Sequence, residues 1–407
     1  MHKVPVPFVH AVKTMDQTTA APSIAEPREH LPDADDFLLW PPCLQSHGYR
    51  IVDRLFATRT IARSTHPTTI PRARELDLSY SIDGERRSLA ELMDRNAIAG
   101  LLIIKNGEIV LERYGLGLTA SDRWSTMSMV KSMSAVLVGA AIADGFLNSV
   151  DDLVSDHLPQ LSASAYAGVT VRHLLTMSSG VAWLEDYADR TSHVNQYSRL
   201  LAARQRGGVL DLLRTLSSAN RPGTVWSYNT GDTYLLGAVL VAATRTALAD
   251  YMASKIWQPC GMEFDGFYTL DAEGGQEIAG SRAGMTLRDI GRIGMLVAND
   301  GMTGGRRILP AGWVDAMAAR AFDLPAAAAL EHRIALGLTG YGFSWWLRDD
   351  GSMFAMGHSG QRLYINREKR TIVVNLAAYP EPRYRSAAEH DRDAELMALI
   401  NSALAGT

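Results

Sequence analysis

The sequence is poor in cysteine. Its 407 residues include two, Cys43 and Cys260, which lie far apart and lack the spacing of metal ligands. A disulfide framework is therefore not expected, and free thiols indicate a reducing compartment. The chain also has no His-Glu-x-x-His motif and no cluster of cysteines and histidines. We therefore expect neither a metal nor a cofactor.

Positive charge is not in excess either. The 40 lysines and arginines are outnumbered by 44 aspartates and glutamates, which gives a net charge of -4 and a pI near 6.3. Such a chain offers no general basic surface to phosphate backbones, so nucleic acid is not an expected partner. The expected partner is a small molecule. The sequence leaves the assembly state open, a homodimer included.

Long apolar runs are missing too. The longest, Met133 to Ala143, ends at Asp144 and is far shorter than the roughly 20 residues that a membrane-spanning helix needs. The amino terminus has no unbroken apolar segment of the kind that marks a secretion signal. We therefore expect no membrane partner and a cytoplasmic location.

The chain does have enough apolar residues, 47%, to build one large domain or two interlocked ones. Asn106-Gly107 predicts a tight β-hairpin between strands at 101–104 and 109–114, because both central residues of a type I′ turn need positive φ. Helical spacing is found in the middle of the chain, and strand character returns near its end. The main predicted elements are helices at 88–97, 128–143, 170–180, 232–243 and 387–403 and strands at 341–347, 354–365 and 371–376.

We expect the early and late strands to share one antiparallel sheet. The predicted fold class is α/β, with this central sheet flanked by N- and C-terminal helices and a mostly α-helical domain inserted into it. Residues 46–122 and 280–407 would form the discontinuous α/β domain and residues 123–279 the helical one, with the active site between them. Residues 1–45 mix Pro, Thr, Asp and Glu without periodicity and are predicted to be an N-terminal extension, either an extended arm or a partly disordered tail, to which we assign no chemistry.

The most informative motif is Ser128-x-x-Lys131, which opens an apolar stretch that runs to Ala143. Residues three apart on a helix are neighbours, so the lysine amine can reach the serine hydroxyl. A helix that is apolar on every side is buried, and burial lowers the pKa of a lysine until its free amine can act as a base. The unpaired N–H groups of the first helical turn suit an oxyanion beside Ser128. The pattern predicts an activated serine nucleophile.

Ser-x-x-Lys alone is short enough to occur by chance. Chance is a weaker explanation here, because a lysine inside an apolar helix is costly unless it is paired or used. Further stretches follow in a defined order: His173 to Gly180, Pro222 to Gly237 with Tyr228-Asn229-Thr230, Gly284 to Asp289, and Gly357-His358-Ser359-Gly360-Gln361.

With Ser128-x-x-Lys131, these stretches resemble the motifs of the penicillin-recognising serine hydrolases, the superfamily of the class C β-lactamases. The resemblance extends from about residue 101 to 376 and implies a β-lactamase/transpeptidase-like fold. Within this superfamily, three stretches are similar to the 6-aminohexanoate-dimer hydrolases and the family VIII carboxylesterases. They are 183–189, 228–233 and 257–262.

The resemblance also implies roles for individual residues. Tyr228 would assist Lys131 in proton transfer. The backbone N–H groups of Ser128 and Gln361 would form the oxyanion hole, because the strand of the third motif must run beside the nucleophile. Tyr187 would lie over the site and donate to the nitrogen of an amide substrate.

Less specific patterns predict further substrate-binding residues, each of which could instead have a purely structural role. The large aromatic residues among them can equally belong to the core, a histidine at the edge of the site can fill space, and an asparagine can cap a turn. These candidates are Trp183, Asn229, Trp346, His358, Ser359 and Gly360.

The chain departs from the superfamily pattern twice. The usual Tyr-x-Asn has its amide one residue early, at Asn229, and the usual Lys or Arg of the third motif is His358, which is mostly neutral at pH 7. β-Lactamase and peptidoglycan carboxypeptidase activities are therefore not expected. We predict a serine hydrolase that cleaves a small ester or amide through an acyl-enzyme on Ser128. Two alternatives stay open: an acyltransferase of the same fold, and a sensor whose serine is acylated without turnover.

Overall fold

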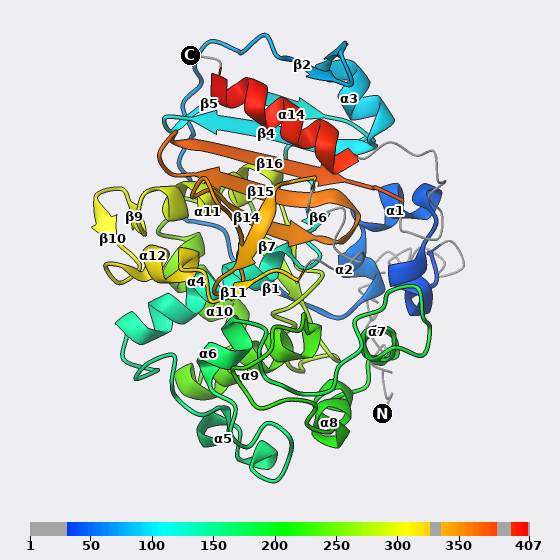
Figure 1. Cartoon of the computed structure of the whole chain (residues 1–407), viewed down its shortest axis with the longest axis vertical. Helices are drawn as coiled ribbons and strands as arrows, with labels where there is room; N and C mark the ends of the chain where they lie inside the picture. Colours follow the sequence, from blue (N-terminus) through cyan, green and yellow to red (C-terminus); the bar gives the residue numbers. More distant parts are fainter. Residues whose placement is uncertain (1–30, 326–334, 381–391, 406–407) are drawn as a thin grey trace, which may run out of the picture. The chain divides into compact units, whose positions relative to one another are not determined.

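Segments from both ends of the chain pair in one antiparallel sheet of eight strands in the computed structural model, which describes residues 31–325, 335–380 and 392–405 (Figure 1). Its order is β11-β12-β13-β14-β15-β16-β4-β5, so the early hairpin β4-β5 joins the late strands through β16. This sheet confirms the predicted α/β fold class. The strands are β4 (Ile98–Lys105), β5 (Glu108–Tyr114), β11 (Phe322–Asp323), β12 (Leu338–Tyr341), β13 (Trp346–Arg348), β14 (Met353–Gly357), β15 (Gln361–Asn366) and β16 (Thr371–Ala377).

Helices cover both faces of the sheet. Successive side chains of a strand point to opposite faces, so Leu101 and Leu102 of β4 enter different layers. Leu101 belongs to the apolar cluster that the last helix, α14 (Arg392–Ala405), completes. Leu102 faces α11 (Leu287–Ala298), where Gly291 allows so close an approach that a Cβ there would lie 2.8 Å from Leu102 Cδ2. A strand covered on both faces is apolar throughout, as β4 is.

The turns of the sheet correct two of the predicted strands. Asn106 and Gly107 have φ of 52° and 85° and form the predicted hairpin turn. The predicted strand 341–347 is instead two paired strands, because the left-handed Ser344, with φ of 58°, reverses the chain between β12 and β13. The predicted strand 354–365 is likewise broken by a tight turn at His358–Gly360. Part of the predicted closing helix, 387–391, lies outside the described residues.

Two nearly fully buried helices, α4 (Met129–Ala143) and α9 (Thr230–Thr244), pack together at the centre of the helical region. They are apolar on every side, which fits burial on every side. The helix predicted at 170–180 begins as expected after the capping residue Thr170, but it ends at Leu175, well before Gly180. The other helical elements of this region are α5 (Val154–His157), η3 (Pro159–Leu161), α6 (Val171–Leu175), α7 (His193–Ala202), α8 (Gly208–Thr215), α10 (Leu248–Met252) and η4 (Ala253–Trp257).

A smaller antiparallel sheet has the order β1-β7-β8-β6. It pairs β6, which leads into Ser128, with β8 from after the helical region, and β1 from before that region forms the opposite edge. The region 123–279 therefore contributes strands as well as helices, and the predicted domain boundaries stay a prediction. The strands are β1 (Thr58–Ile61), β6 (Trp124–Ser125), β7 (Gly266–Thr269) and β8 (Gly284–Met285).

The described part of the predicted N-terminal extension is not extended. Residues Ala34–Leu39 form a 3-10 helix, η2, and Pro42–Gly48 form α1. A short apolar run ending at Trp40 is buried, which accounts for this structure: four consecutive side chains leave water. The prediction of an extended arm or a partly disordered tail is therefore wrong for these residues.

The remaining elements surround these layers. They are α2 (Val52–Leu55), β2 (Ser79–Ile82), β3 (Glu85–Ser88), α3 (Leu89–Arg95), β9 (Met302–Thr303), β10 (Arg306–Arg307) and α12 (Trp313–Ala318). Of these, α3 was predicted, and Ser88 caps it together with Glu91.

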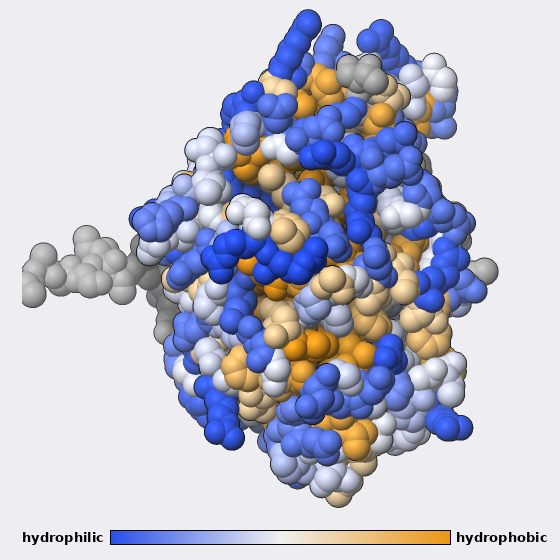
Figure 2. Space-filling model, turned by 90° about the vertical axis from the view of Figure 1, so that its left-hand side faces the viewer, coloured by the Kyte–Doolittle hydropathy of each residue, from blue (hydrophilic) through white to orange (hydrophobic). Residues whose placement is uncertain are grey.

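Within the described residues, no single helix has both the length and the hydropathy to cross a membrane. The bent pair of Thr230–Thr244 with Leu248–Trp257, which meet at 79°, passes that test by length and composition. On the face that Figure 2 presents, hydrophilic residues cover much of the surface and hydrophobic residues lie between them in small groups.

Candidate active site

Ser128 lies at the first turn of α4, where a strained backbone presents it. Met127, the residue before it, has φ of 48°, an uncommon value for a side chain of that size. Met127 is buried, whereas Ser128 is only half-buried and lines a pocket. The tight turn from β6 into α4 therefore exposes Ser128 to the pocket while Met127 stays buried.

The Lys131 amine lies directly beside this serine. Lys131 is 1% exposed, and its Nζ lies within hydrogen-bonding distance of Ser128 Oγ at 2.8 Å, of Thr230 Oγ1 at 3.1 Å and of the carbonyl oxygen of Gly280 at 2.6 Å. The predicted contact between Ser128 and Lys131 is thus present.

The hydrogen bonds of Lys131 Nζ show that the lone pair of its neutral amine points to Ser128. The Gly280 carbonyl can only accept, and the Thr230 hydroxyl gives its own proton to Glu185 Oε1 at 2.5 Å, so it accepts from Lys131. A neutral amine has two N–H donors and one lone pair. Both donors are used by these two acceptors, which leaves the lone pair for the hydroxyl proton of Ser128. The geometry suits proton transfer from the serine to the lysine.

The pKa of Lys131 fits the same role. Burial lowers it from 10.5 to about 8, the nearby Glu185 carboxylate works against that shift, and the Arg282 guanidinium adds to it. Desolvation dominates because the ammonium ion loses its water shell inside the protein. A fraction of the amine is therefore neutral near pH 7, as the sequence predicted.

Glu185 is a part of the site that the sequence analysis missed. Its carboxylate accepts from the Thr230 backbone N–H at 3.0 Å, from the Tyr187 hydroxyl at 2.8 Å and from the indole N–H of Trp183. With the Thr230 hydroxyl, four donors hold it in place. Glu185 lies in a polar segment, Leu-Glu-Asp-Tyr, where nothing in the sequence distinguishes it from a solvated acid.

Tyr228 contacts Lys131 through its ring. The amine lies 5.1 Å from the ring centroid, and the Trp346 ring stacks on Tyr228 with its centroid 5.5 Å away. Trp346 is 3% exposed and, like Tyr228, is not among the residues that line the pocket. Trp346 supports the tyrosine ring, and its contact with substrate stays a prediction.

Two predicted binding residues do line the pocket beside Ser128. The rings of Tyr187 and His358 lie 4.9 Å apart there. Tyr187 comes from the loop before α7 and His358 from the turn between β14 and β15. The full lining is Leu38, Met127, Ser128, Tyr187, Val194, Tyr197, Thr230, Ser281, Arg282 and His358.

Asn229 and Trp183 have structural roles, and their contact with substrate stays a prediction. Asn229 is 1% exposed and caps α9 by accepting from the Asp232 N–H at 3.1 Å, while its neighbour Thr230 makes the contact with Lys131. Trp183 is buried, stacks on His193 and bonds to Glu185. Both residues stabilise the groups that surround the amine.

Ser359 and Gly360 likewise support the site and do not line the pocket. Ser359 is buried and its Oγ accepts from Tyr49 at 3.1 Å and from Gln45 at 3.4 Å. Gly360 has φ of 91° and lies against the Tyr379 ring, where a Cβ would be 2.8 Å from ring atoms. Gln45 and Tyr49 come from and directly after α1, so the N-terminal segment fixes this turn.

The predicted oxyanion hole is supported in outline. Gly357 of β14 lies so close to the nucleophile turn that a Cβ would be 2.4 Å from the Thr126 carbonyl oxygen, and Gln361 is the strand partner of Gly357. The Gln361 side chain is buried and bonds to Trp124 and to backbone groups. That the N–H groups of Ser128 and Gln361 form the hole stays a prediction.

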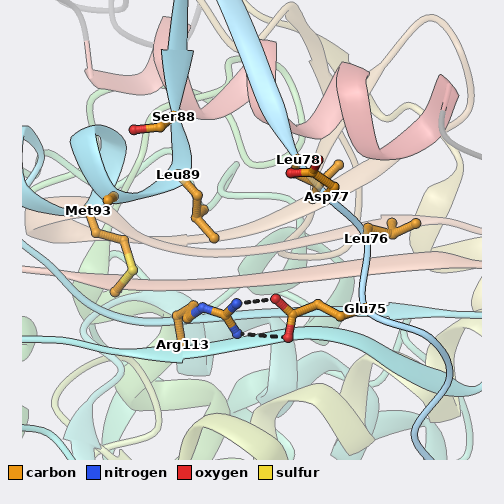
Figure 3. Close-up of a pocket in the computed structure, with 9 residues that line it drawn as sticks. Glu75, Leu76, Asp77, Leu78, Ser88, Leu89, Met93 and Arg113 are labelled. Atoms are coloured by element: carbon orange, nitrogen blue, oxygen red, sulfur yellow. Dashed lines mark hydrogen bonds and ion pairs between the residues drawn. The ribbon is translucent and has the colours of Figure 1, made fainter.

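A larger cavity of ≈ 490 Å³ lies elsewhere, between α3, β5 and the segment before β2 (Figure 3). Two of its charged groups, Glu75 and Arg113, are paired with each other. Its Ser88 hydroxyl donates to the Glu91 carboxylate in the capping box of α3, which is a structural role. The described residues contain no group of three or more His, Cys, Asp or Glu side chains that could hold a metal ion.

Comparison with known proteins identifies the family. The family model described as Beta-lactamase matches residues 86–396. The chain belongs to the beta-lactamase family. The 6-aminohexanoate-dimer hydrolase of Paenarthrobacter ureafaciens is 25% identical over 309 residues, which are 73% of this chain and 76% of that protein.

Solved structures agree with this membership of the beta-lactamase family. A Bacillus anthracis protein, provisionally assigned as a 6-aminohexanoate-dimer hydrolase, has a TM-score of 0.77 at 21% identity and covers 93% of this chain and 97% of its own. A family VIII carboxylesterase has a TM-score of 0.54 at 17% identity and covers 77% and 95%. The superfamily resemblance read from the sequence is therefore confirmed, and the homologues are hydrolases.

Proposed function

We propose that this member of the beta-lactamase family is a serine hydrolase that cleaves a small ester or amide through an acyl-enzyme on Ser128. The observation that carries the proposal is the contact of Lys131 Nζ with Ser128 Oγ at 2.8 Å, made by an amine whose two N–H donors are used elsewhere. The hydrolase activities named for its relatives agree with this reaction class.

In the first half of the reaction, Ser128 Oγ attacks the substrate carbonyl carbon while Lys131 Nζ takes the hydroxyl proton. The negative charge moves to the carbonyl oxygen, which the backbone N–H groups of Ser128 and Gln361 would stabilise. The bond to the alcohol or amine then breaks, and that leaving group receives the proton from Lys131 with the assistance of the Tyr228 phenol. The acyl group stays on Ser128.

In the second half, water replaces the leaving group. Lys131 takes a proton from water, the hydroxide attacks the acyl carbon, and the ester bond to Ser128 breaks as Oγ recovers its proton. The products are a carboxylic acid and the free enzyme. The space between the pocket residues holds about one water molecule, so side chains of the lining must move to admit a substrate.

The proposal is tested by labelling with a fluorophosphonate, which reacts with activated serines, followed by intact-mass measurement and mapping of the adduct. We expect one adduct, on Ser128. Ser128→Ala should lose the adduct and lower the turnover of short p-nitrophenyl esters by at least about 1,000-fold.

A second serine in the same pocket supplies the matched control. The Ser281 hydroxyl lies 3.1 Å from the Tyr197 hydroxyl, and among the described residues no lysine is hydrogen-bonded to it. Ser281→Ala should still be labelled on Ser128. An adduct on Ser281, or undiminished turnover by Ser128→Ala, contradicts the proposal. A stable adduct with a substrate ester and no turnover would instead select the sensor alternative, and products that need an added alcohol or amine would select the acyltransferase.

A further inference from the structure

Arg282 is a buried cation in the wall of the active-site pocket. It is 1% exposed and lines the same pocket as Ser128. It comes two residues after Gly280, whose carbonyl accepts from Lys131, and its backbone is left-handed, with φ of 59°. Its charge lies near enough to Lys131 to lower the pKa of that amine.

Most of the donors of this guanidinium are unused. Nη2 donates to Ser198 Oγ at 2.6 Å, whereas Nε and Nη1 are buried and have no hydrogen-bond partner among the described residues. Nor does any carboxylate of the described residues form an ion pair with Arg282. The carboxylate of Glu185, which acts on the pKa of Lys131, is already held by Trp183, Tyr187 and Thr230.

Aromatic rings replace a carboxylate partner in part. The guanidinium carbon lies 4.7 Å from the ring centroid of Phe37, 5.2 Å from that of Phe56 and 5.9 Å from that of Tyr197. Cation–π contacts stabilise a desolvated cation but leave its N–H donors unsatisfied. Burial lowers the pKa of Arg282 from 12.5 to about 10, so the group is still charged near pH 7.

A buried guanidinium in which two nitrogen atoms have no hydrogen-bond acceptor costs free energy unless an anion pairs with it. A guanidinium is suited to a carboxylate, which can accept two parallel N–H bonds from it. The walls beside Arg282 include the apolar side chains of Leu38, Met127 and Val194, which suit a short aliphatic chain. The pocket therefore combines a nucleophile, an apolar wall and an unpaired cation.

We propose that the substrate is an ester or amide that carries a carboxylate on a short aliphatic or aromatic spacer, and that Arg282 binds this carboxylate in the pocket. The inference rests on the proposed hydrolase function and narrows its substrate class. Arg282 then determines specificity. An anionic substrate is favoured over a neutral substrate of the same shape, because the neutral substrate leaves the guanidinium without a carboxylate partner.

The test compares kcat/KM for two matched pairs of esters. One pair carries the charge on the acyl side, p-nitrophenyl hemisuccinate against its methyl ester. The other carries it on the leaving group, 4-acetoxybenzoate against methyl 4-acetoxybenzoate. We expect the anionic member to be preferred by about 10- to 100-fold in at least one pair, the range for a hydrogen bond to a charged group.

Variants then assign the preference to Arg282. Arg282→Gln should bring the ratio of the two kcat/KM values close to one, and Arg282→Lys should retain part of it. Arg221→Gln removes the same charge from an exposed side chain and should keep the wild-type ratio. Glutarate, a free dicarboxylate, should inhibit the wild type and fail to inhibit Arg282→Gln.

The inference is overturned if the wild type shows no preference in either pair, or if Arg282→Gln keeps the wild-type ratio. If Arg282→Gln does not fold, the wild-type ratios and the Arg282→Lys ratio decide. Failure of the proposed function is a separate result, since it would appear as undiminished turnover of the neutral esters by Ser128→Ala. If Ser128→Ala loses this turnover but the wild type shows no preference for anionic esters, only the proposed carboxylate binding is rejected, and the hydrolase function stands.

Discussion

The hydroxyl of Thr230 donates to Oε1 of Glu185 at 2.5 Å. That hydroxyl has one proton, so it can only accept from Lys131. The carboxylate of Glu185 therefore orients the Lys131 amine without contacting the reacting atoms. Glu185 is therefore a positioning residue, and its charge also raises the pKa of Lys131.

Glu185→Gln should lower kcat/KM by about tenfold, the value of one hydrogen bond to a charged group. It should also move the acid limb of the pH profile to lower pH, since removal of a negative charge lowers the pKa of a nearby ammonium group. If Glu185 had only a structural role, its substitution would lower kcat/KM without moving the acid limb of the pH profile. Asp211→Asn, on an exposed residue of α8, should change neither the rate nor the limb.

Tyr228→Phe removes the phenol and keeps the ring that stacks on Trp346 and faces Lys131. We expect kcat to fall by about 100-fold, the range for loss of one proton-transfer group, and the unfolding temperature to stay close to that of the wild type. Steady-state kinetics and thermal unfolding measure these two effects. A kcat equal to that of the wild type would remove the phenol from the mechanism.

Local sequence patterns were enough to predict the parts of this site that lie close together in the chain. Ser128 and Lys131 are three residues apart on one helix, and Asn106-Gly107 fixes its hairpin by backbone preference alone. The apolar run of β4 reflects cover on both faces by helices that lie far away in the sequence. Periodicity and turn chemistry carry this information without knowledge of the tertiary contacts.

The residues that the sequence did not predict depend on long-range contacts. Glu185 and Arg282 reach the site from separate loops, and only the fold shows that the acid is fully bonded and the arginine is not. Of the two roles that the sequence left open for Asn229, the structure shows the cap, on α9, and its neighbour Thr230 contacts the amine. The burial of Leu38 and the residues around it was missed because the apolar run is short and lies among acidic residues and prolines.

Asn229→Ala should affect stability and not chemistry. Loss of the cap on α9 should lower the free energy of unfolding by about 1 kcal/mol, and Asn229→Ser, which restores a capping oxygen, should recover most of it. Chemical denaturation measures the change. A large loss of kcat in Asn229→Ala with unchanged stability would restore Asn229 to the substrate-binding residues.

Gly357→Ala tests how closely β14 must approach the nucleophile. The added Cβ would lie 2.4 Å from the Thr126 carbonyl oxygen, so the strand or the turn before Ser128 must move. We expect a loss of kcat/KM of about 100-fold, since a displacement of about 1 Å in an active site has that effect. Gly168→Ala, where a Cβ meets no atom within 4 Å, is the matched control and should keep wild-type activity.

The neutral amine of Lys131 is the central claim, and the pH dependence of the acylation step tests it most directly. The pKa of Lys131 is lowered to about 8, and the active form is the deprotonated one, so the rate must rise with pH and level off above that value. The burst of p-nitrophenol from a neutral ester, followed by stopped flow, should therefore show one acid limb with an apparent pKa of about 8. Lys131→Arg, which cannot lose its proton in this range, should abolish the burst. A burst that is independent of pH, or that rises near the histidine reference value of about 6.5, would contradict this account.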